Sequence, residues 1–264
     1  MQCAAALIAA GAAVAQPVLD YQPDVGQNGK DVVWVPTSDA VVRRMLDMAG
    51  VTAADYVVDL GSGDGRTVIA AAGRGARALG IEYDQNLVNL SIQNAAKAGV
   101  GDRATFVKAD LFETDFSRAT VLTLFLLPDL NLRLRSRILD MRPGTRVVSN
   151  TFDMSDWEPD AEAKEPAPGC RSYCKALFWI VPAKVGGTWR FEGGELALEQ
   201  KYQMLTGSVR SGNAVQPVTE GRLRGEEITF TAGGRTYTGR VKGDVIEGTS
   251  GSGASRTPWR AVRA

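Results

Sequence analysis

The 264-residue chain contains no histidine. Without this side chain, a Ser-His-Asp triad, a Cys-His dyad and any zinc or iron site with histidine ligands are excluded. A general base must therefore be a carboxylate, a lysine, a tyrosine, a thiolate or water. Cysteine is also scarce, with three residues in the chain. Because we expect only two of them in the mature protein, an iron–sulfur cluster with three cysteine ligands is excluded, and no metal site is expected.

The sequence also lacks a net charge and a long apolar run. Lys plus Arg and Asp plus Glu each number 30, which disfavours a protein that coats nucleic acid, because such proteins usually carry a basic excess. No run reaches about 18 apolar residues, so no membrane-spanning helix is expected. The length allows one large domain, or one medium and one small domain.

The amino-terminal segment has the features of an export signal. Residues 4–15 are apolar or small and end in an A-x-A cleavage pattern before Gln16. Residues 1–15 are therefore predicted to be a signal peptide, and the mature protein to be periplasmic or secreted. The alternative is a disordered or buried Ala-rich segment of a cytoplasmic protein. In an oxidising compartment, Cys170 and Cys174 are predicted to form a disulfide, the alternative being two unpaired thiols.

Apolar periodicity divides the rest of the chain into three parts. Residues 16–50 form a lead-in followed by a helix, and residues 51–183 then alternate between strand and helix. The unbroken apolar run at 120–127 is typical of a buried parallel strand. We therefore predict an α/β domain with a doubly wound, mostly parallel sheet. Residues 186–264 are rich in glycine and show a period of two, which predicts a small antiparallel β-domain of about five strands.

A glycine-rich turn follows the first predicted strand. Gly61, Gly63 and Gly65 come after Asp59 and before a helix, where backbone N–H groups can face a ligand. A dinucleotide fingerprint requires G-x-G-x-x-G, whereas the spacing here is G-x-G-x-G. Asp59 would repel a phosphate but could receive an ammonium group. The methionyl end of S-adenosylmethionine (SAM) carries an ammonium and a carboxylate, so the pattern favours SAM over a dinucleotide.

Two further acidic residues follow the next two strands. Glu82 ends the second predicted strand, about 20 residues after the first glycine, where a carboxylate can accept hydrogen bonds from ribose hydroxyls. The alternative for Glu82 is a solvated strand end. Asp110 follows the third strand and could accept from an adenine amino group while Leu111 packs on the ring. The alternative for Asp110 is a turn cap.

These motifs resemble those of class I, seven-stranded SAM-dependent methyltransferases. The resemblance covers about residues 31–182 and rests on three stretches, 59–65, 80–82 and 109–111. It implies SAM as the cofactor, with the three stretches binding methionine, ribose and adenine respectively. The cofactor-binding residues expected on this basis are Thr37, Asp59, Gly61, Ser62, Gly63, Gly65, Glu82, Tyr83, Asp110 and Leu111.

A narrower resemblance is to the small protein-lysine methyltransferases that modify the c polypeptide of mitochondrial ATP synthase and adenine nucleotide translocase, and to their bacterial and archaeal relatives. It implies a protein substrate whose lysine amine accepts the methyl group. No nucleic-acid partner is expected, and the sequence leaves the oligomeric state open. The resemblance rests on Val35-Pro36-Thr37, on Asp64-Gly65-Arg66, on residues 123–128 with Asn131 and Leu132, and on residues 143–149.

The acceptor is expected at the end of the fourth strand. Methyl transfer from a sulfonium depends mainly on in-line approach of the nucleophile. Leu127, Pro128 and Asp129 are predicted to align the acceptor through their carbonyls, with the Asp129 carboxylate taking a proton; the alternative for Leu127 is plain core. The acidic segment 153–165, with Trp157, is interpreted either as a flap over the acceptor pocket or as a solvated loop. The tryptophans are otherwise expected to pack.

Other functions remain open at this point. A nicotinamide-dependent oxidoreductase is disfavoured by the glycine spacing. An exported SAM-fold scaffold without catalysis, and a methyltransferase of a small molecule, are not excluded by any residue. The β-domain could select the acceptor, cover the pocket or mediate dimerisation.

Overall fold

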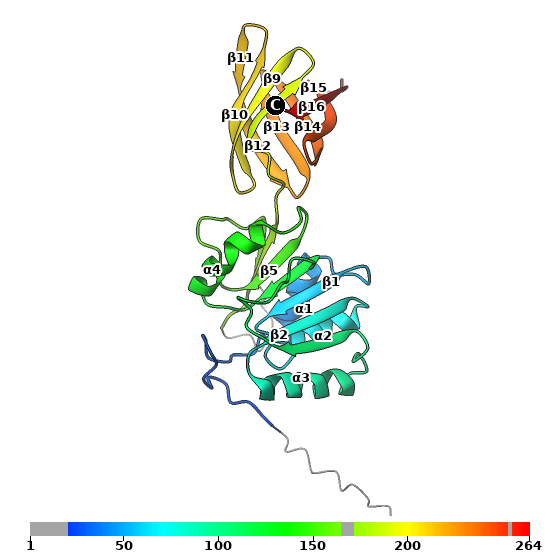
Figure 1. Ribbon diagram of the computed structural model, residues 1–264, viewed down its shortest axis with the longest axis vertical. Helices are drawn as coiled ribbons and strands as arrows, with labels where there is room; N and C mark the ends of the chain where they lie inside the picture. Colours follow the sequence, from blue (N-terminus) through cyan, green and yellow to red (C-terminus); the bar gives the residue numbers. More distant parts are fainter. Residues whose placement is uncertain (1–20, 165–171, 253–254) are drawn as a thin grey trace, which may run out of the picture.

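The computed structural model describes residues 21–164, 172–252 and 255–264. These residues form a seven-stranded sheet with helices on both faces, followed by an antiparallel β-barrel (Figure 1). The predicted signal peptide, residues 1–15, and Cys170 lie outside the described residues. Cys174 is disulfide-bonded.

The first sheet has the strand order β3-β2-β1-β4-β5-β7-β6. The strands β1 to β5 pair in parallel, whereas β7 is antiparallel to both of its neighbours. The predicted mostly parallel α/β sheet is therefore confirmed. The strands are β1 (Tyr56–Leu60), β2 (Arg77–Glu82), β3 (Ala104–Lys108), β4 (Val121–Leu124), β5 (Arg146–Asn150), β6 (Ala161–Lys164) and β7 (Lys175–Ile180).

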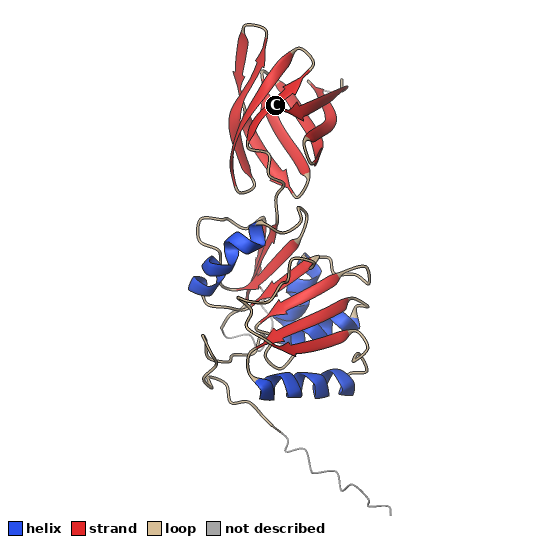
Figure 2. Cartoon of the chain, viewed as in Figure 1, coloured by secondary structure: helices blue, strands red, loops and turns tan. Residues whose placement is uncertain are grey.

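The helices cover the two faces of this sheet unequally, as the blue ribbons of Figure 2 show. Helices α1, α2 and α3 share one apolar cluster with one face, whereas α4 shares a second cluster with the other. Each buried leucine or valine stabilises these layers by about 1.5–3 kcal/mol. None of the helices in the described residues is long and apolar enough to cross a bilayer. The helices are α1 (Asp39–Met48), α2 (Arg66–Gly73), α3 (Gln85–Lys97) and α4 (Pro128–Leu139).

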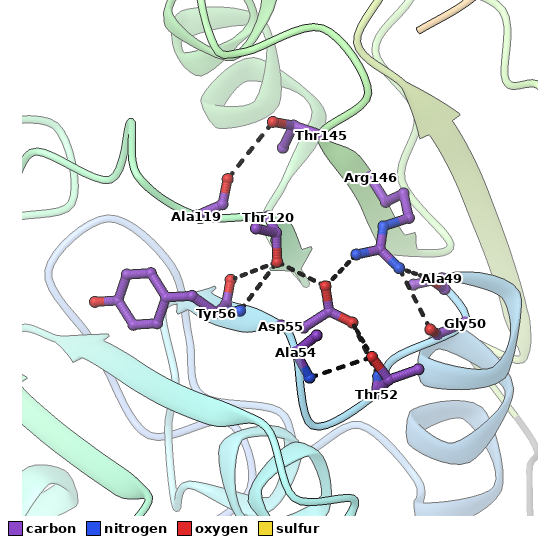
Figure 3. A network of polar contacts seen from close by, with 10 residues as sticks. All are labelled: Ala49, Gly50, Thr52, Ala54, Asp55, Tyr56, Ala119, Thr120, Thr145 and Arg146. Carbon is purple, nitrogen blue, oxygen red and sulfur yellow. Dashed lines mark hydrogen bonds and ion pairs between the residues drawn. The ribbon is translucent and has the colours of Figure 1, made fainter.

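A buried polar network ties the amino ends of three strands to the end of α1 (Figure 3). The Asp55 carboxylate pairs with Arg146 and accepts from the Thr120 hydroxyl at 2.8 Å and from the Thr52 N–H at 2.9 Å. Arg146 also donates to the carbonyl of Ala49, the residue that caps α1, at 2.6 Å. Burial alone would raise the pKa of Asp55, but these partners outweigh it and lower that pKa. The network fixes the edge of the sheet opposite to the ends of β1 and β4.

The carboxyl-terminal part is a barrel and not the predicted sheet of about five strands. Nine strands pair in sequence, and pairing of β16 with β8 and of β9 with β10 closes the ring. The prediction was wrong because several strands show no alternation; β11 exposes every side chain. A Cβ at Gly248 would collide with the Thr238 carbonyl, so glycine allows this close approach. The strands are β8 (Gly187–Phe191), β9 (Gly194–Lys201), β10 (Met204–Ser211), β11 (Ala214–Pro217), β12 (Thr219–Arg224), β13 (Glu227–Ala232), β14 (Arg235–Lys242), β15 (Val245–Gly251) and β16 (Thr257–Arg263).

The acidic segment after β5 is neither a flap nor a solvated loop. It crosses one face of the sheet and ends as the edge strand β6, which was not predicted. Trp157 is fully buried, with its ring centroid 6.0 Å from that of Trp179 and 6.0 Å from that of Tyr202. The acidic neighbours hid this anchor, because the sequence around Trp157 has no apolar period.

The barrel is fastened to this same segment. The Tyr202 hydroxyl, in the turn between β9 and β10, donates to Asp156 at 2.9 Å, and Arg222 pairs with Asp160 at 2.7 Å. The Gln203 amide donates to the Glu158 carbonyl at 2.8 Å. Asp160 accepts from the N–H at the end of β7, so these contacts lie near the sheet edge where β7 ends.

Candidate functional site

A crevice lies at the carboxyl ends of β1, β2 and β4, where the strand order reverses direction. Its walls are residues 27–37 of the lead-in, the glycine loop, the ends of β2 and β3, and residues 124–126. All the predicted cofactor-binding residues line it except Gly65. No residue of the barrel, as far as the structure describes it, contributes to the wall. The barrel therefore does not cover the crevice, which corrects one of the roles considered for it.

The glycine loop is shaped by close neighbours on both sides. Gly61, Gly63 and Gly65 have φ values of 80°, 55° and 83°, which favour glycine. A Cβ at Gly63 would lie 2.7 Å from the Trp34 indole nitrogen, and one at Gly65 would lie 2.8 Å from Phe106. Gly65 thus permits packing of α2 on the sheet, although it lies outside the crevice. Trp34 was expected to pack in the core, and instead it walls the crevice.

Asp59 is the most perturbed acid of the crevice. It ends β1 beside Gly80 and Thr123 and is 6% exposed. Burial raises the pKa of Asp59 to about 7, and the nearby Glu82 and Asp64 carboxylates add to this rise. The Thr123 hydroxyl donates to its carboxylate at 2.5 Å and opposes it. A cationic group placed beside Asp59 would stabilise its ionised form.

Glu82 and Ser62 sit on either side of the turn. The Glu82 carboxylate accepts from the N–H groups of Gly63 at 2.9 Å, Tyr83 at 2.8 Å and Asp84 at 3.0 Å, so it is ionised in a fixed orientation. The Ser62 hydroxyl is buried and has no hydrogen-bond partner among the described residues. Because an unpaired buried hydroxyl costs about 1–3 kcal/mol, it marks a place where a ligand or a water can bind.

The lead-in contributes residues that the sequence pattern did not reveal. The Lys30 ammonium pairs with Asp110 and lies 4.8 Å from the centroid of the Tyr83 ring, which is 48% exposed. The hydrogen bond from Lys30 lowers the pKa of Asp110, and the same bond raises the pKa of Lys30. Asp110 also accepts from the Phe112 N–H at 2.8 Å, so it caps a turn as well as facing the crevice. Only the separation of 80 residues concealed this pair.

Thr37 connects the lead-in to the glycine loop and to β5. Its carbonyl accepts from Arg66 at 2.9 Å, and its hydroxyl accepts from Asn150 at 3.3 Å. Arg66 also donates to Asp64 at 2.6 Å. The motif residues Thr37, Asp64 and Arg66 are therefore brought together as one polar junction beside the crevice.

Comparison with known proteins places this architecture in a family. A family model described as the ANTKMT methyltransferase domain matches residues 59–161. A protein-lysine N-methyltransferase of Saccharolobus islandicus is 44% identical over 131 residues, which are 48% of this chain and 81% of that protein. The chain belongs to this methyltransferase family. It is a SAM-dependent methyltransferase.

Two further relatives of the methyltransferase bear on cofactor and acceptor. A crystal structure of an RNA methyltransferase from Salinibacter ruber, in complex with S-adenosyl-L-homocysteine, is 46% identical, with a TM-score of 0.53, and the match covers 57% of this chain and 96% of that one. The lysine N-methyltransferase of Homo sapiens that is named for the c polypeptide of ATP synthase is 37% identical over 128 residues. This chain spans about half of that human protein, 54%. SAM is the cofactor of the family, and the nicotinamide alternative is set aside.

The predicted acceptor-aligning residues lie apart from the crevice wall. Leu127, Pro128 and Asp129 are exposed and do not line it, whereas Phe125 and Leu126 do. Leu127 caps α4, and its carbonyl accepts from the N–H groups of Leu130 and Asn131 at 3.0 and 3.1 Å. That carbonyl is therefore occupied by the start of α4.

Proposed function

We propose that this methyltransferase transfers the methyl group of SAM to the ε-amine of a protein lysine. The observation that carries the proposal is the match to the lysine methyltransferase of Saccharolobus islandicus, of which the chain covers 81%. Bound SAM supplies a methyl group on a sulfonium, which needs no acid or base to leave. The lone pair of the lysine nitrogen forms a bond to the methyl carbon while the carbon–sulfur bond breaks and sulfur keeps the electron pair. The proton of the amine passes to water.

The crevice residues fit this cofactor by their chemistry. We assign Asp59 to the methionyl ammonium, because its buried carboxylate lacks a cationic partner among the described residues around it. The unpaired Ser62 hydroxyl is suited to the methionyl carboxylate. Glu82, held by three N–H groups, presents its remaining lone pairs to the ribose. Asp110 and Leu111 are assigned to the adenine, with Tyr83 and Lys30 closing that end.

The electrostatics of the acceptor side favour an amine over RNA, which is the substrate class named for the Salinibacter ruber protein. Asp129 and Asp153 are exposed near the ends of β4 and β5, and the chain as a whole has no basic excess. Carboxylates at this edge repel phosphates and attract a lysine ammonium.

The test is transfer of labelled methyl from SAM into protein and RNA fractions of the source cells. Acid hydrolysis should release the label as methyl-lysine, and the Asp59→Ala variant should transfer none. Label that appears only in RNA, lipid or small molecules would contradict the proposal. Retention of full activity by Asp59→Ala would contradict the assignment of the cofactor site.

We also propose that the enzyme acts outside the cytoplasm. The A-x-A pattern before Gln16 supports this, and the disulfide-bonded state of Cys174 fits an oxidising compartment. Amino-terminal sequencing of the protein from fractionated cells should give Gln16 as the first residue, in the periplasmic or secreted fraction. An intact Met1 in the cytoplasmic fraction would refute this proposal and leave the chemistry untouched.

A further inference from the structure

Three aromatic rings gather beside the cofactor crevice. Phe125 follows β4, Phe152 follows β5 by two residues, and Tyr173 precedes β7 by two. Because β7 runs antiparallel to β5, all three lie at the edge of the sheet where the crevice opens. The ring centroids are 5.2 Å apart for Phe125 and Tyr173, 5.7 Å for Phe152 and Tyr173, and 5.9 Å for Phe125 and Phe152. We call these residues the aromatic trio.

The aromatic trio is an open extension of the crevice and not a piece of core. Phe125 is itself part of the crevice wall, so the rings lead from the cofactor site toward β5 and β7. None of the three is buried, and Tyr173 is 42% exposed. The Phe125 and Phe152 rings are within 17° of parallel, whereas Tyr173 is inclined by 63° to Phe125 and 52° to Phe152. Rings in such an arrangement offer faces in different directions to one ligand.

The backbone holds two of these rings in place at a cost. Thr151 and Tyr173 have φ values of 63° and 58°, in the left-handed region that β-branched and bulky residues rarely adopt. The Phe152 N–H donates to the Asn150 carbonyl at 2.7 Å, and the Phe152 carbonyl accepts from Ser149 at 2.7 Å. Strained residues that the surroundings fix in this way are concentrated at functional sites.

Asn131 adds a polar group beneath the same turn. Its amide donates to the carbonyls of Phe152 and Asp153 at 3.2 and 3.1 Å, and its buried Oδ1 has no hydrogen-bond partner in the part of the chain that the structure describes. Asn131 thus supports the turn that carries Phe152 from below, and an unused acceptor is left beside it.

We propose that the aromatic trio receives the side chain of the acceptor lysine and directs its nitrogen past Phe125 into the cofactor crevice. This inference rests on the proposed function and assigns its second substrate site. The four methylenes pack against the rings, and the ammonium and its methylated forms are attracted to the ring faces. The apolar walls also lower the pKa of the lysine amine, which favours the neutral nucleophile.

Kinetics of ring-removing variants test the inference. Phe152→Leu and Tyr173→Leu keep apolar bulk but remove the ring, whereas Tyr173→Phe keeps the ring. With poly-L-lysine as the acceptor, each leucine variant should lower kcat/KM by about tenfold, since one cation–π contact changes binding by about 2- to 30-fold. Tyr173→Phe should retain most of the activity, and the affinity for S-adenosyl-L-homocysteine should stay within about twofold in all three. Ile92→Ala, which truncates a side chain 51% exposed on α3, is the matched control.

A second measurement does not depend on turnover. 4-Fluorophenylalanine at position 152 reports binding by fluorine NMR, with the enzyme saturated by S-adenosyl-L-homocysteine. Choline, a quaternary ammonium, should shift this resonance and bind at least about fivefold more tightly than its neutral isostere 3,3-dimethyl-1-butanol. Equal binding of the two, or no shift with either, would overturn the inference.

The two proposals fail separately. Methylation of lysine with unchanged kcat/KM in both leucine variants overturns the role of the aromatic trio and leaves the proposed function standing. Absence of methyl-lysine together with selective choline binding overturns the proposed function, while the cation site at the trio is supported.

Discussion

Asp59 should make the cofactor-free enzyme less stable in the same conditions in which it binds the cofactor. Its carboxyl is buried, and its pKa is raised from 3.8 to about 7. A folded-state pKa above the unfolded value means that folding is penalised once the group must ionise. The penalty is absent below pH 4, grows between pH 4 and 7, and is complete above pH 7.

The size of this penalty follows from the shift. About three pKa units at ~1.4 kcal/mol each set a ceiling near 4 kcal/mol, and relaxation around Thr123 reduces it to about 2–4 kcal/mol. Asp59→Asn removes the charge and keeps an acceptor for the Thr123 hydroxyl. In the absence of cofactor, this variant should therefore melt roughly 5–15 °C above the wild type at pH 8 and close to it at pH 4.

Cofactor binding should change in the opposite direction. A charge-assisted hydrogen bond to the methionyl ammonium contributes about 1.5–3 kcal/mol, so Asp59→Asn should bind S-adenosyl-L-homocysteine about 10- to 100-fold more weakly. Calorimetric melting from pH 4 to 8.5, with and without this ligand, measures both effects. Asp102→Asn, which neutralises a carboxylate 66% exposed, is the control. A difference in melting temperature that is the same at pH 4 and pH 8, or an unchanged affinity, would refute the reasoning.

Three other predictions follow from contacts described above. Lys30→Met should weaken S-adenosyl-L-homocysteine binding by about tenfold and abolish most of its salt dependence, as measured by titration calorimetry; equal salt dependence would contradict the role of the pair. Asp55→Asn should lower the unfolding free energy by about 2–4 kcal/mol at pH 7 in urea titrations, and because the pKa of Asp55 is lowered, the difference should shrink as the pH falls below its unfolded pKa. Tyr202→Ala should split thermal unfolding into two transitions, one for each domain, because it removes the stacking on Trp157 and the bond to Asp156; a single transition lowered as a whole would show that other contacts hold the barrel.

The sequence predicted the catalytic sheet because its signals are local. The helix over Arg66–Gly73 and the strand over Ala104–Lys108 have the bounds that periodicity indicates. The barrel and β6 were missed or undercounted because their signals are not local. A closed barrel needs few large inward side chains, and a strand such as β11 buries none. Segment 153–164 is anchored by Trp157, whose partners Trp179 and Tyr202 come 22 and 45 residues later.

The candidate site divides along the same line. Glycine spacing and the acids after β1, β2 and β3 mark positions that a parallel sheet must bring together, and the structure places Asp59, Glu82 and Asp110 around one crevice. Lys30 and Trp34 could not be anticipated, because the fold of the lead-in depends on contacts with the loop it covers. For the acceptor side, attention fell on Leu127 to Asp129, although the end of β4 is continued sideways by Phe125 and not by α4.

The position of the lead-in has a consequence for the number of methyl groups that one encounter can deliver. Lys30 and Asp110 close the crevice on the β3 side of the sheet, whereas the aromatic trio opens on the β7 side. Spent cofactor can therefore exchange through the first opening while the modified side chain stays in the second. Such a layout with two doors suits processive conversion to di- and trimethylated products without release of the polypeptide, and single-encounter trapping experiments would show it as a burst of higher methylation states.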